Sequence, residues 1–159
     1  ISMSLGSISS DSRQKAYEEA VKYANAKGSI VIAAAGNSNQ NAKDYSPANA
    51  KGIISVSALG PDQRKAPFSN TVKDLSYGIA APGMKILSTY PKGQYKEMDG
   101  TSMATPMVAG LVGMLKAFRP DITTQEVYNI LYETGKALPD GKSTGRMIQA
   151  ADALERVAD

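Results

Sequence analysis

The 159 residues fit the usual size of one domain, and a hydrophobic content of 42% is enough for one substantial core. The net charge of +3 comes from scattered Lys and Arg residues, so the composition indicates neither nucleic-acid binding nor binding to an anionic membrane. Cysteine and histidine are both absent, which excludes disulfides, thiolate zinc sites and a cysteine nucleophile, and leaves no imidazole to act as a general base.

The first third of the chain predicts a strand, a helix and a second strand. Residues 1–6 lack the basic start and long apolar run of a signal peptide, and we interpret them as a strand entered midway. An amphipathic helix is expected from residues 9–12 to Gly28, since its apolar residues recur with helical spacing. Residues 30–35 form a continuous apolar run, which is typical of a strand buried on both faces of a parallel sheet.

The middle of the chain predicts further strands separated by polar loops. A polar loop at residues 37–49 leads into a strand at 53–58, and a charged turn follows at 60–67. Shorter strands are expected near residues 75–80 and 86–89. Strands that alternate with helices indicate an α/β layered fold with a mostly parallel sheet.

The last third predicts three helices. The run from Met103 to Leu115 is apolar almost all round, so we expect this helix to pass through the core. It is too short to span a bilayer, which takes roughly 20 residues. Residues 123–126 form a capping-box pattern that begins a second helix, and a third is expected at about 147–157.

Two segments carry candidate chemistry. Residues 100–106, Gly-Thr-Ser-Met-Ala-Thr-Pro, deliver Ser102 to the first turn of the apolar helix, where the helix dipole favours developing negative charge. Residues 30–37 place Asn37 just beyond the carboxyl end of a buried strand, the edge where open α/β sheets bind ligands. An asparagine amide there can donate hydrogen bonds to an oxyanion. Taken alone, each segment is more often a helix cap or a turn.

Together these segments resemble the C-terminal half of the catalytic domain of the subtilases, the subtilisin-like serine proteases of peptidase family S8. The resemblance covers about two thirds of the chain, in the family's order and spacing. The loop at residues 44–48, Asp-Tyr-Ser-Pro-Ala, is similar to that of the proteinase K-like branch. The matching stretches are Ile1–Gly6, Ala33–Asn37, Phe68–Asn70, Ala81–Gly83 and Gly100–Gly110.

The resemblance implies a three-layer subtilisin-like α/β fold, with residues 1–159 as the C-terminal portion of one catalytic domain. It implies that Ser102 attacks the scissile carbonyl through an acyl-enzyme, and that Asn37 and the Ser102 backbone N–H hold the oxyanion with support from Thr101. It also implies a substrate pocket with small, uncharged walls, which favours apolar or aromatic side chains. The residues expected to contact substrate are Ser4, Leu5, Gly6, Ala35, Gly36 and Tyr45.

The family takes its catalytic Asp and His from the part of the domain that precedes the strand at residues 1–6. Because the chain has no histidine, we expect it to be inactive alone and to need an N-terminal fragment of the same protease as its partner. A nicked enzyme, a truncated chain and a degenerate homologue would each explain this. The alternative function is a non-catalytic pseudoprotease that binds peptides or regulates a protease.

Three further expectations follow from the resemblance. Catalysis needs no cofactor, although structural calcium is common in the family. Gly78 stands where many relatives have a calcium-binding aspartate, which argues against a calcium site there. Met103 follows the nucleophile directly, so oxidation of its thioether is expected to impair the assembled enzyme. Most relatives are exported, so an extracellular location is expected.

Overall fold

The computed structural model describes residues 1–158 as an α/β fold around a four-stranded parallel sheet. The strand order is β1-β3-β5-β6, so β1 forms one edge of the sheet. These strands are β1 (Ser2–Met3), β3 (Ile32–Ala34), β5 (Ile54–Leu59) and β6 (Gly78–Pro82). The predicted parallel α/β architecture is confirmed.

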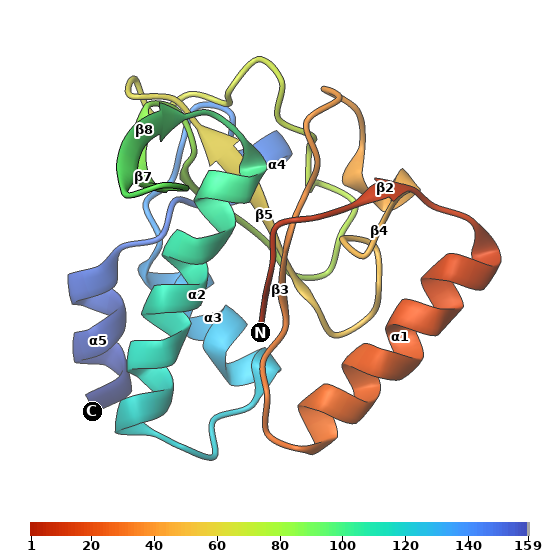
Figure 1. Ribbon diagram of the computed structural model, residues 1–159. Coiled ribbons are helices and arrows are strands. Elements are labelled where there is room, and N and C mark those ends of the chain that lie inside the picture. Colours follow the sequence, from red (N-terminus) through yellow and green to blue (C-terminus); the bar gives the residue numbers. More distant parts are fainter. Residues whose placement is uncertain (159) are drawn as a thin grey trace.

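Helices cover both faces of the sheet, which gives the three layers that the resemblance implies. On one face, Val21 of α1 (Asp11–Ala26) packs against Val31, Ala33 and Ile53. On the other face lie three helices whose buried side chains share one core with Ile54, Val56 and Ile79 (Figure 1). They are α2 (Thr101–Phe118), α3 (Thr124–Thr134) and α5 (Ala150–Ala158).

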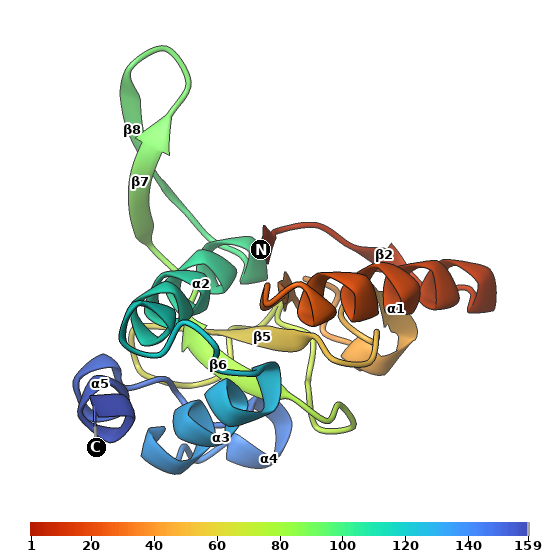
Figure 2. The same ribbon diagram turned by 90° about the horizontal axis from the view of Figure 1, so that it is seen from below.

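Shorter elements complete the described chain. The hairpin of β7 and β8 projects from the body of the protein just before α2 (Figure 2). The others are the antiparallel pair β2 (Ser7–Ile8) and β4 (Tyr45–Ser46), the 3-10 helix η1 (Ala42–Asp44), the hairpin strands β7 (Ile86–Tyr90) and β8 (Gln94–Met98), and helix α4 (Gly141–Thr144).

The register of the parallel strands brings the site segments together. Met3 pairs with Ala33 and Ala34 with Val56, so the chain leaves β1 and β3 on the same side of the sheet, at the carboxyl ends of its parallel strands.

At α3, Thr123 and Glu126 form the predicted capping box, with Thr123 N donating to Glu126 Oε2 at 2.9 Å. The Thr123 backbone N–H and hydroxyl lower the pKa of the exposed Glu126 carboxyl.

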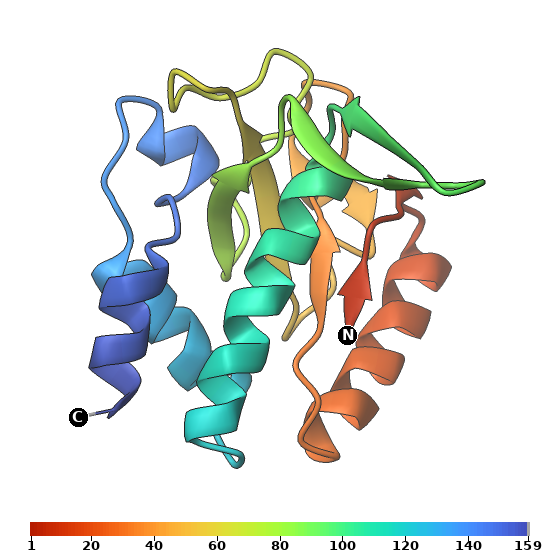
Figure 3. The same ribbon diagram turned by 60° about the vertical axis from the view of Figure 1, so that its left-hand side comes forward.

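The structure differs from the sequence-based expectations at several elements. The strand predicted at residues 30–35 is regular only over Ile32–Ala34, and the structure adds β8, whose mostly polar residues gave no strand signal. Helix α2 does not pass through the core on all sides, since Met107, Met114 and Phe118 are 42%, 44% and 59% exposed. The sheet and α5 contact only one side of α2, so its opposite apolar face is open within residues 1–158 (Figure 3).

Candidate active site

The ends of β1, β3 and β4 and the first turn of α2 line an open cavity of about 310 Å³. This cavity contains every predicted site residue except Ala35. None of the lining side chains carries a formal charge, so the cavity has no built-in partner for a charged group. The lining residues are Ser4, Leu5, Gly6, Ala34, Gly36, Asn37, Ser38, Tyr45, Thr101 and Ser102.

Ser102 is the second residue of α2 and lies at the helix N-terminus. The preceding turn is fixed by Gly100 N, which donates to Gly83 O at 2.8 Å. The backbone N–H groups of a first helical turn have no intrahelical acceptor, so that of Ser102 is available to a ligand. The position therefore suits a group on which negative charge develops.

The Ser102 hydroxyl donates to a carbonyl and has no base beside it in the described chain. Its Oγ lies 3.4 Å from Ser4 O, while the Ser4 hydroxyl donates to Ser102 O at 2.8 Å. These two contacts join the end of β1 to the start of α2. A hydroxyl that meets only a carbonyl stays protonated and is a weak nucleophile.

Thr101 fixes the orientation of the Asn37 carboxamide. Thr101 N donates to Asn37 Oδ1 at 2.9 Å, and the Thr101 hydroxyl donates to the same oxygen at 2.8 Å. Because a backbone N–H can only donate, the atom that it meets must be the carbonyl oxygen of the amide. The Nδ2 group of Asn37 is thus left to donate to a ligand in the cavity.

Thr101 also ties α2 to the end of β3. Its side chain is 0% exposed, and Gly36 N donates to its hydroxyl oxygen at 3.2 Å. One buried hydroxyl therefore contacts two residues just beyond this strand, Gly36 and Asn37. The predicted grouping of Asn37, Thr101 and Ser102 is present in the structure as a connected set.

Ala35 is the one expected substrate-contact residue that is not among the residues lining the cavity. Its side chain is 0% exposed and packs in a cluster with Ala42, Ala48 and Val72. Side chains alternate across a strand, so Ala34 faces the cavity and Ala35 faces away from it. The alternation of side chains along a strand is the sequence signal that could have predicted that Ala34 lines the cavity. Ser38 also lines the cavity and was missed.

The surroundings of Gly78 do not fit a calcium site. A Cβ atom at Gly78 would lie 2.6 Å from Val72 Cγ2 and 2.9 Å from Val72 O, so an aspartate would require Val72 to move. Within residues 1–158, no three acidic side chains gather in a way that could hold a metal ion. Val72 occupies the space that a calcium-binding carboxylate at this position would need.

Comparison with known proteins identifies one family. Residues 1–148 match the family described as the Subtilase family. The chain is 37% identical to subtilisin DY of Bacillus licheniformis over 150 residues, which cover 92% of this chain and 53% of that protein. It is 44% identical to thermitase of Thermoactinomyces vulgaris over 119 residues, which cover 72% of this chain and 39% of that protein.

Solved structures agree with these relatives. A protease from Pseudoalteromonas arctica PAMC 21717 superposes with a TM-score of 0.85 at 31% identity, over 96% of this chain and 49% of that one. A cold-adapted subtilisin-like serine proteinase gives a TM-score of 0.82 at 30% identity, over 93% of this chain and 53% of that one. The chain thus spans about half the length of several relatives that it matches.

In the described part of the chain, no helix has the length and apolar character needed to span a bilayer.

Proposed function

Because this chain belongs to the subtilase family, we propose that it forms the nucleophile-bearing and oxyanion-binding part of a serine endopeptidase. The observation that carries the proposal is the free Nδ2 group of Asn37. Thr101 occupies the amide oxygen with two donors, so Nδ2 and the Ser102 backbone N–H are the donors left for a substrate oxygen. A helix cap has no need of an oriented amide beside it.

In the proposed reaction, Ser102 Oγ attacks the carbonyl carbon of the scissile peptide bond while a base takes the hydroxyl proton. Asn37 Nδ2 and the Ser102 N–H hold the oxygen that becomes negative. When the C–N bond breaks, the base returns the proton to the leaving amine, and an ester to Ser102 remains. Water then hydrolyses this ester by the same steps in reverse.

The base must come from outside these 159 residues, since the sequence contains no histidine. We propose that the partner is another part of the same protease, which brings an Asp–His pair to Ser102. On its approach the Ser102 hydroxyl would exchange the Ser4 carbonyl, now 3.4 Å away, for the imidazole as its acceptor. Without that partner the chain would bind a peptide without cleaving it.

The cavity favours an uncharged side chain on the residue before the cleaved bond. Its walls of Gly, Ala, Ser and Leu residues and the half-buried Tyr45 offer apolar surface and no carboxylate to pair with Lys or Arg. β1 pairs only with β3 in the described sheet, so an extended peptide could pair with the backbone that continues beyond β1 at Ser4–Gly6. Proteins and unfolded peptides are therefore the proposed substrates.

The test is hydrolysis of two peptides that differ only in Phe or Lys before the scissile bond, by the protein as its gene encodes it. We expect cleavage with a higher kcat/KM for the Phe peptide, and none by Ser102→Ala, which serves as the background control. Cleavage that persists in Ser102→Ala would overturn the assignment of the nucleophile. Preference for the Lys peptide would overturn the assignment of the cavity.

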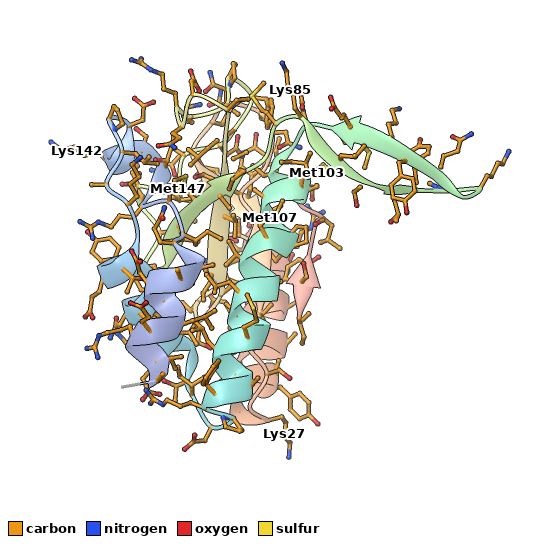
Figure 4. The ribbon with its side chains drawn as sticks, turned by 90° about the vertical axis from the view of Figure 1, so that its left-hand side faces the viewer. Lys27, Lys85, Met103, Met107, Lys142 and Met147 are labelled. Carbon is orange, nitrogen blue, oxygen red and sulfur yellow. The ribbon has the colours of Figure 1, made fainter. Side chains whose placement is uncertain are left out.

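Oxidation of Met103 is predicted to lower activity, because a sulfoxide would place a polar group beside Ser102. Met103 is half-buried in the first turn of α2, and Figure 4 shows it one turn before Met107. We expect peroxide to reduce kcat of the wild-type enzyme and to spare Met103→Leu. Met114→Leu is the matched control on the same helix and should remain sensitive. Full activity of wild-type protein with Met103 shown by mass spectrometry to be oxidised would contradict this prediction.

Other features belong to the same proposal. No cofactor takes part in the proposed steps. The crowding at Gly78 argues against a calcium site at Gly78, and this argument applies to no other position. The export of most family members supports an extracellular location. The Asp44–Ala48 segment supports a position near the proteinase K-like branch.

A further inference from the structure

The segment Phe68–Thr71 runs beside the loop that carries Asn37. Asn39 N donates to Phe68 O at 2.8 Å, and Thr71 N donates to Gln40 O at 2.8 Å. Between these two backbone contacts stands Asn70, whose N–H donates to Gly36 O at 2.9 Å. Phe68–Asn70 is one of the stretches that resemble the subtilase family, but it has no role in the proposed reaction steps.

The Asn70 carboxamide is wholly buried, at 0% exposure, and all its contacts are to the backbone on either side of Asn37. Its Nδ2 donates to Ala35 O at 2.9 Å. Its Oδ1 accepts from Ser38 N at 3.0 Å and from Gln40 N at 2.9 Å. One side chain thus holds the residues before and after Asn37.

The absence of a side chain at Gly36 leaves room for the Asn70 carboxamide. A Cβ atom at Gly36 would lie 2.4 Å from Asn70 Nδ2, and its φ of +105° is one that residues other than glycine rarely adopt. The Asn70 amide therefore fills the space where a side chain at position 36 would stand. The chain bends sharply there and presents Asn37 to the cavity.

We propose that Asn70 is a positioning residue of the oxyanion-binding site, holding the backbone of Asn37 while Thr101 holds its side chain. The inference rests on the proposed endopeptidase function. Within Asn37, Thr101 contacts only the carboxamide oxygen, and its one contact to this loop's backbone, from Gly36 N at 3.2 Å, holds the chain before Asn37 but not after it. The Asn70 contacts at Ala35, Gly36, Ser38 and Gln40 supply the missing constraint.

Replacement of Asn70 should move the oxyanion donor without unfolding the protein. Lys65 Nζ donates to Asn39 Oδ1 at 2.8 Å and to Ser69 O at 2.9 Å, so the two segments stay joined when the carboxamide is removed. A displacement of a catalytic donor by about 1 Å can cost about 10²-fold in rate. We expect Asn70→Ala to lower kcat by about 10-fold to 10²-fold with little change in KM.

A role in positioning is distinguished from a role in stability by a double-mutant cycle in the gene-encoded protein. If Asn70 acts through Asn37, Asn70→Ala costs kcat far less in an Asn37→Ala background than in the wild type. Asn25→Ala is the matched control. Asn25 also bonds backbone, donating to Gly52 O at 2.9 Å, but it lies on α1 away from the cavity, and its loss should leave kcat unchanged.

The second measurement does not depend on activity. In ¹⁵N-labelled protein, the side-chain amide of Asn37 should show restricted motion in the wild type and in Asn25→Ala, and fast motion in Asn70→Ala. If Asn70→Ala does not fold, Asn70→Ser is used in its place, since a hydroxyl is too short to span from Ala35 to Ser38. An unchanged Asn37 amide, or additive losses of kcat in the cycle, would overturn the role of Asn70. An inactive wild type would overturn the proposed function, and the amide motion would still decide this role.

Discussion

Replacing Asn37 by alanine in the gene-encoded protein is expected to lower kcat by about 10²-fold to 10³-fold, while KM changes little. This magnitude is the one known for the oxyanion asparagine of subtilisin and is borrowed from that enzyme. The physical reason lies in the two bonds from Thr101 at 2.9 and 2.8 Å, which leave Nδ2 as the donor toward the cavity. That donor meets more negative charge in the transition state than in bound substrate, so its loss falls on kcat.

Asn37→Asp is the companion variant for this prediction. It retains the oxygen that accepts from Thr101 but replaces the Nδ2 donor by a second acceptor, so kcat should fall at least as far as in Asn37→Ala. Steady-state kinetics on one peptide substrate measure both variants. A kcat within twofold of the wild type for either variant would show that Asn37 does not bind the oxyanion.

Replacing Gly83 by alanine is expected to destabilise the fold by about 1–3 kcal/mol or more, the range for overpacking a core. A Cβ at Gly83 would lie 2.6 Å from Ala58 Cβ and 2.8 Å from Gly100 O. Both atoms belong to backbone or to short side chains, so neither can turn away. The same strain would reach the turn before Ser102, because Gly100 N donates to Gly83 O.

Gly141→Ala is the control for Gly83→Ala, since no atom lies within 4 Å of a Cβ built at that position. Its effect should stay within about 0.5 kcal/mol. Urea unfolding of both variants measures the difference, with equal m-values as the check that the same transition is compared. Equal stabilities of the two variants would contradict the close packing of Gly83 against Gly100.

The sequence predicted the parts of the fold that depend on local pattern. The apolar run before Asn37, the helix after Ser102 and the capping box at Thr123 each have a signal within a few neighbouring residues. The strand β8 has none, since it is mostly polar and takes its structure from pairing with β7. The open face of α2 was also missed, because apolar residues do not say whether a neighbour covers them.

The candidate site was predicted as a set of residue types but not as a network. Asn37, Thr101 and Ser102 could be named from two short segments, and the structure brings them together at the edge of the sheet. The contacts of Asn70 could not be predicted, because they join residues 30 to 35 positions apart in the chain. Strand alternation places the Ala34 side chain at the cavity, whereas the side chain of Ala35, the residue that the resemblance indicates, packs on the opposite side.

Fluorophosphonate labelling followed by peptide mass mapping tests whether Ser102 is a nucleophile whose base lies outside these 159 residues. We expect the gene-encoded protein to be labelled at Ser102, at a rate that falls by orders of magnitude in the 159-residue chain alone. Equal labelling of the two proteins would contradict the need for an external base. Labelling at another residue, or no labelling of the gene-encoded protein, would contradict the assignment of Ser102.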